Sequence, residues 1–139
     1  MEVGCITNHT SARKRFLREM HGFDRFVRWW TVSDLVAARK PDAAIFEAFL
    51  ATAGLRADGC FVDDLPQNLE GARRLGFATV AFAPTGDPGP GHVVVDGFAG
   101  LASLVLEADS PLTGAASTGP VCTRGANAGA TPSPLRSNR

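Results

Sequence analysis

The sequence has no excess of charge of either sign, because its 139 residues carry 14 Lys and Arg against 14 Asp and Glu. A balanced charge gives no support to binding of nucleic acid or of an anionic membrane surface, so we predict neither partner. No uninterrupted apolar run approaches the roughly 18 residues that a membrane span needs. The opening residues lack the basic flank of a signal peptide, which predicts a cytoplasmic protein.

Cysteine is scarce, and its spacing is unlike that of a metal site. Cys5, Cys60 and Cys122 are far apart in the sequence, and an odd number without an export signal predicts reduced thiols. From Ser110 onwards the chain is rich in Gly, Pro, Ser and Thr and has no acidic residue. Such a composition buries too little apolar area to offset its ordering entropy. We therefore predict one domain over residues 1–108 and a disordered tail over residues 109–139.

Short apolar runs alternate with helical patterns along the predicted domain. Extended segments are predicted near residues 3–6, 26–33, 59–62, 78–82 and 93–95. Helices are predicted near residues 11–21, 41–53, 66–75 and 99–107. Because the strand-like runs are continuously apolar, they are typical of a mostly parallel sheet that helices cover on both faces. The pattern predicts an α/β fold.

Polar side chains follow two of the predicted strands. Thr7 and Asn8 come after the first strand, Asp63 and Asp64 come after the strand that begins at Gly59, and Lys40 precedes a predicted helix. Ligands of open parallel sheets bind beyond the carboxyl ends of the strands. A hydroxyl, an amide, a cation and two carboxylates can together hold a phosphate group and Mg²⁺. Each feature alone is also typical of an ordinary loop.

The order of these features is similar to that in a known family. The stretches GCITNHT, TVSDLVAARKPDAAIFEAFL and CFVDDLPQNLEGARRLGFATVAF match three successive motifs of haloacid dehalogenase-like (HAD) hydrolases. Residues 3–84 resemble the C-terminal part of such an enzyme, and the doubled Asp resembles its phosphatase-type subgroup. The resemblance implies a Rossmann-like three-layer sandwich with a mostly parallel sheet.

The resemblance also implies an activity, that of a Mg²⁺-dependent phosphatase that acts on a small phosphorylated metabolite through an aspartyl-phosphate. Thr7, Asn8 and Lys40 would bind the phosphoryl group, and Thr7 and Lys40 would also serve catalysis. Asp64 would be the Mg²⁺ ligand with Asp63 as its partner, and Asn68 would support the metal loop.

The nucleophile motif of the family, Asp-x-Asp, is absent from this sequence, because no two aspartates are separated by one residue. The resemblance implies that the strand bearing this motif lies between the strands that end at Thr7 and Asp63. Without it we expect an incomplete sheet, an exposed strand edge that favours self-association, and no activity of the chain alone. The alternative hypothesis is a non-catalytic remnant of the fold that binds phosphate and Mg²⁺, or another protein.

Overall fold

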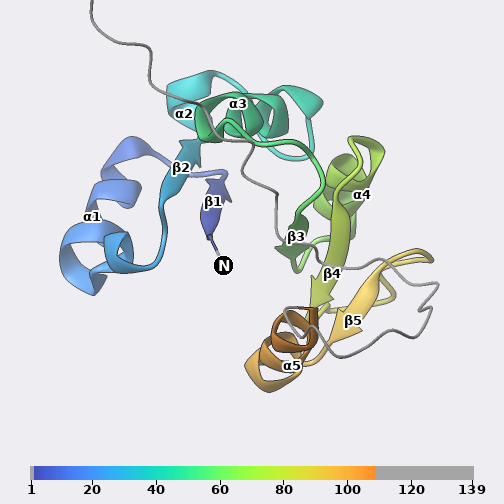
Figure 1. The fold of residues 1–139 in the computed structure, drawn as a ribbon. Helices are drawn as coiled ribbons and strands as arrows, with labels where there is room; N and C mark the ends of the chain where they lie inside the picture. The colour runs from blue at the N-terminus through green and yellow to red at the C-terminus, as the bar shows by residue number, and fades with distance from the viewer. Residues whose placement is uncertain (1, 109–139) are drawn as a thin grey trace, which may run out of the picture.

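The protein, described by a computed structural model over residues 2–108, alternates strands with helices (Figure 1). The strands are β1 (Gly4–Thr7), β2 (Trp29–Val32), β3 (Cys60–Asp63), β4 (Ala78–Phe82) and β5 (Val93–Val95). The helices are α1 (Ser11–His21), α2 (Ser33–Val36), α3 (Ala43–Ala53), α4 (Pro66–Arg74) and α5 (Phe98–Ala108), with a short 3₁₀ turn at Phe23–Arg25. None of the helices within residues 2–108 has the length and apolarity that a bilayer crossing requires.

The strands form two separate parallel ladders. One ladder has the order β1-β2 and the other the order β3-β4-β5. Within residues 2–108, β1 and β3 therefore each pair with a strand on one side alone. This arrangement confirms the predicted α/β fold with an incomplete, parallel sheet.

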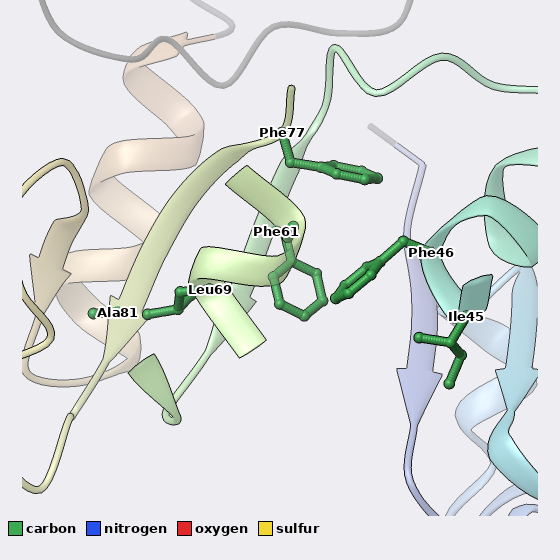
Figure 2. Packing of buried hydrophobic residues seen from close by; sticks show 7 residues of the cluster. Ile45, Phe46, Phe61, Leu69, Phe77 and Ala81 are labelled. Atoms are coloured by element: carbon green, nitrogen blue, oxygen red, sulfur yellow. The ribbon is translucent and has the colours of Figure 1, made fainter. Parts of the chain in front are cut away.

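An aromatic cluster lies between α3 and the β3-β4-β5 ladder. The ring of Phe46, from α3, is 5.2 Å from that of Phe61 and 6.2 Å from that of Phe77, measured between centroids (Figure 2). Leu69 of α4 is fully buried in the same cluster, and Ile6 of β1 packs against it. Since α3 also packs on β1 and β2, this core connects the two ladders without backbone pairing between them.

Helices cover both faces of the larger ladder. Ala81 of β4 belongs to the core beneath α4, whereas the ring of the next residue, Phe82, packs against that of Phe98 in α5, with 4.8 Å between the ring centroids. Because successive strand residues point to opposite faces, α4 and α5 lie on opposite sides of β4. The larger ladder thus has the three-layer arrangement that was expected.

Several predicted boundaries coincide with the structure. Helix α1 has the predicted limits and ends at Gly22, whose φ of 62° is a left-handed conformation that suits glycine. Helix α3 begins at Ala43, two residues later than predicted, because Asp42 occupies the N-cap position. The predicted extended segment 26–33 is shorter than expected, and α2 was not predicted. The predicted tail, 109–139, lies outside the described residues.

Candidate phosphate and metal site

An ion pair lies at the carboxyl end of β3. Lys40 Nζ donates to Asp63 Oδ2 at 2.6 Å, and the two side chains are only 13% and 6% exposed. Lys40 comes from the connection between α2 and α3, and Asp63 is the last residue of β3. The lysine ammonium also lies 5.6 Å from the centre of the Phe61 ring, so the core holds its side chain from one side. The sequence predicted both residues at the site, but not that they form an ion pair.

The carboxylate of Asp63 has two further donors besides Lys40. The backbone amide of Leu65 and Nδ2 of Asn68 each donate to Asp63 Oδ1 at 3.0 Å, and Asn68 is buried in the first turn of α4. Burial raises the pKa of Asp63, but the hydrogen bonds from Lys40, Leu65 and Asn68 outweigh it and hold the pKa below its ordinary value. Asp63 is therefore an ionised, fully engaged carboxylate.

Asn8 fixes the backbone of Lys40. Its Nδ2 donates to the Lys40 carbonyl at 2.9 Å, and its Oδ1 accepts from the Lys40 amide at 2.7 Å. Asn8 directly follows β1, so hydrogen bonds run from the end of β1 through Lys40 to Asp63 at the end of β3. The structure thereby brings Asn8, Lys40, Asp63 and Asn68 together at one edge of the two ladders.

Close approach of α4 to the Lys40 loop depends on a glycine. A Cβ atom at Gly71 of α4 would lie 2.5 Å from the Pro41 carbonyl oxygen and 3.3 Å from the Phe46 ring. No side chain fits there without a shift of the loop. Pro66 begins α4, where the missing amide of proline costs nothing because the first turn has free donors. These two residues set the position of Asn68 relative to Asp63.

The other two predicted site residues lie at the same strand ends but are not part of this network. Thr7 is the last residue of β1, is partly buried and pairs with Val32 of β2. Asp64 is exposed, and its carboxylate forms no hydrogen bond or ion pair with another described residue. It borders an open hollow of about 530 Å³ between β3, β4 and α5. Asp64 is thus available to a ligand in a way that Asp63 is not.

The residues present fit a weakly coordinated Mg²⁺ and do not form a closed metal site. No group of three or more His, Cys, Asp or Glu side chains within residues 2–108 is arranged to hold a metal ion. Mg²⁺ commonly binds through one or two carboxylates, with waters and phosphate oxygens completing its shell. Among the predicted site residues, Asp64 is the carboxylate without a partner among the described residues, so it is the residue that would hold such an ion.

Solved structures share this arrangement of elements. A HAD phosphatase from Thermococcus onnurineus superimposes with a TM-score of 0.65 at 22% identity, over 75% of this chain and 50% of that one. The chain has the HAD-like fold. An L-2-haloacid dehalogenase superimposes on the same fold with a TM-score of 0.63 at 17% identity, over 76% of this chain and 50% of that one.

This HAD-like chain spans about half the length of the solved structures that it matches. Comparison with models of protein families finds no match. Comparison with curated proteins finds none either. The resemblance noted in the sequence is therefore supported at the level of the fold, since one structural neighbour is a phosphatase and the other a dehalogenase.

Proposed function

We propose that this chain supplies the phosphate- and metal-binding part of a HAD-family hydrolase, most closely a Mg²⁺-dependent phosphatase for a small phosphorylated metabolite. The observation that carries this proposal is the buried pair of Lys40 and Asp63, with Asn8 holding the lysine backbone from the end of β1. A cation buried at the carboxyl edge of a parallel sheet is placed where ligands of such sheets bind. It can neutralise the charge of a phosphoryl group there.

Each residue has a distinct part in this proposal. Lys40 uses one ammonium hydrogen on Asp63, which leaves two to donate to phosphoryl oxygens. The hydroxyl of Thr7, at the end of β1, would donate to another phosphoryl oxygen. Asp63 holds Lys40 in place, and Asn68 holds Asp63. Asp64 would hold Mg²⁺, which when bound would draw negative charge away from the phosphate.

The attacking carboxylate of an aspartyl-phosphate mechanism has to come from outside these 139 residues, because the sequence has no Asp-x-Asp pair. We therefore expect hydrolysis of p-nitrophenyl phosphate when a strand bearing Asp-x-Asp-x-Thr is supplied, fused to the chain or as a separate segment. Asp64→Asn should abolish that hydrolysis, while Glu47→Gln, at an exposed position of α3, should leave it unchanged. Full activity of Asp64→Asn would contradict the metal assignment.

A second candidate is a protein that binds phosphate and Mg²⁺ without turnover, or that binds another protein at a strand edge. The unpaired edges of β1 and β3 favour this candidate, because free backbone donors and acceptors can pair with a further strand. Titration calorimetry of the chain with Mg²⁺ and inorganic phosphate tests the small-ligand version. Sedimentation at several concentrations tests self-association through the edges. A folded monomer with no heat of binding would exclude the small-ligand version and self-association through the edges.

A further inference from the structure

A second hollow lies next to Asn8 and is separate from the one that Asp64 borders. It has a volume of about 810 Å³ and is open to solvent. Its walls come from the residues after β1, the start of α1 and the connection from α2 to α3. Asn8 belongs to this wall and also binds Lys40, so the hollow adjoins the proposed phosphate site. The proposed function makes no use of it.

Two arginines on the wall of this hollow have no anionic partner. The side chains of Arg13 and Arg39 form no ion pair and no hydrogen bond with any of the described residues. The Arg13 guanidinium lies 5.5 Å from the centre of the Phe16 ring, a contact that restricts its orientation. A planar guanidinium binds a carboxylate or a phosphate through two parallel hydrogen bonds. Both arginines are therefore available for an anionic ligand.

The acidic residues on the same wall lie at the N-terminal ends of helices. Asp34 Oδ2 accepts from the backbone amide of Ser11, the first residue of α1, at 2.6 Å. Asp42 occupies the N-cap position of α3, and its side chain makes no capping hydrogen bond. The N-terminus of a helix carries a partial positive charge that offsets a nearby carboxylate. The wall has two arginines and two aspartates, and neither arginine forms an ion pair with either aspartate, so both guanidinium groups keep their hydrogen-bond donors for a ligand.

We infer that this hollow binds a second anionic group of the substrate, on the part that leaves when the phosphate ester is cleaved. The substrate class is then a small phosphate monoester with a further carboxylate or phosphate group. Arg13 and Arg39 bind that group, while Lys40 and Thr7 bind the phosphoryl group. This inference rests on the proposed function, because it takes the Lys40 site as the position of the first phosphate.

Calorimetry of the 139-residue chain in Mg²⁺ tests the inference with two matched pairs of ligands. In the first pair, phosphoglycerate carries a carboxylate that glycerol phosphate lacks. In the second pair, fructose bisphosphate carries a second phosphate that fructose phosphate lacks. One charge-assisted contact corresponds to about a tenfold change in affinity, so at least one doubly anionic ligand should bind about tenfold more tightly than its partner. Arg13→Gln and Arg39→Gln should each remove most of this gain. Arg15→Gln, on α1 but outside the hollow, should preserve it.

The outcomes separate this inference from the proposed function. Suppose that glycerol phosphate binds, that Lys40→Gln abolishes this binding, and that a second anionic group brings no gain in affinity. This result would refute the subsite and leave the proposed function intact. A gain that survives both arginine variants would place the second anion elsewhere and refute the inference as well. No binding of any phosphate would refute both. The three arginines are exposed, so circular dichroism should show the same fold for every arginine variant.

Discussion

Replacement of Lys40 by methionine gives the most direct test of the reasoning about the site. The variant removes the ammonium but keeps most of the apolar stem, so Asp63 remains at 6% exposure without its cation. Breaking a buried ion pair by removing one partner costs about 3–5 kcal/mol. Asp63 keeps its hydrogen bonds from Leu65 and Asn68 in this variant. We therefore expect a loss in free energy of unfolding at the lower end of that range, about 3 kcal/mol at neutral pH. That is a large part of the ~5–15 kcal/mol that stabilises a small domain.

The destabilisation caused by Lys40→Met should depend on pH, and the direction of this dependence follows from the lowered pKa of Asp63. The pKa of Asp63 in the folded chain lies below its ordinary value of 3.8, so its ionised form stabilises the fold above that value. This contribution is lost as the pH falls through the lowered pKa, because the carboxyl is then protonated in the folded state too. In Lys40→Met, burial without the cation raises the pKa of Asp63. The difference in free energy of unfolding between the two proteins should therefore shrink as the pH falls below 4.

Urea unfolding at pH 7 and near pH 3, followed by circular dichroism, measures this difference. Arg39→Met is the matched control, since Arg39 is the neighbouring residue, is exposed and has no ion pair among the described residues. We expect it to change the stability by no more than about 0.5 kcal/mol. A cost for Lys40→Met below about 1 kcal/mol at pH 7, or one that is equal at both pH values, would refute our account of the pair.

Three further predictions concern the core and the loop that carries Lys40. Phe46→Ala should lower the free energy of unfolding by about 3–5 kcal/mol, and Phe46→Leu by less, because Phe46 is fully buried against two other rings; chemical unfolding measures both. Gly71→Ala should destabilise the chain by about 1–3 kcal/mol, since its Cβ would meet the Pro41 carbonyl, although alanine is the better helix former; a stabilised variant would contradict this packing. Asn8→Ala should cost about 1–3 kcal/mol through the unsatisfied Lys40 backbone groups and should weaken phosphate binding in calorimetry.

Local patterns predicted most of the elements. The limits of α1 followed from its helical periodicity and from Gly22, and β4 and β5 followed from continuous apolar runs between turn residues. Helix α2 was missed because its four residues are too few to show a period. The segment 26–33 was predicted as extended from its aromatic and β-branched residues, yet β2 covers only Trp29–Val32 of it, and Ser33 already begins α2. Propensity alone does not resolve a single turn.

The site was predicted as a set of residues but not as a geometry. The order of Thr7, Lys40 and Asp63 along the chain places them at strand ends, which the parallel topology brings to one edge. The ion pair between Lys40 and Asp63 depends on how closely α4 approaches the loop before α3, and Gly71 sets that distance. Likewise, Asn8 was predicted to bind phosphate, but its amide also holds the Lys40 backbone. Such contacts arise from packing between distant segments.

The division of the strands into two ladders changes the order of protection against hydrogen exchange. In a continuous sheet the strands at the centre exchange their amide hydrogens most slowly, and those at the rim exchange first. Here β1 and β3 lie at the inner border between the ladders, yet within residues 2–108 each has a strand partner on one side alone, whereas β4 is paired on both. The amides of β4 should therefore exchange slowest, and those of β1 and β3 should be no better protected by strand pairing than those of the outer strands β2 and β5.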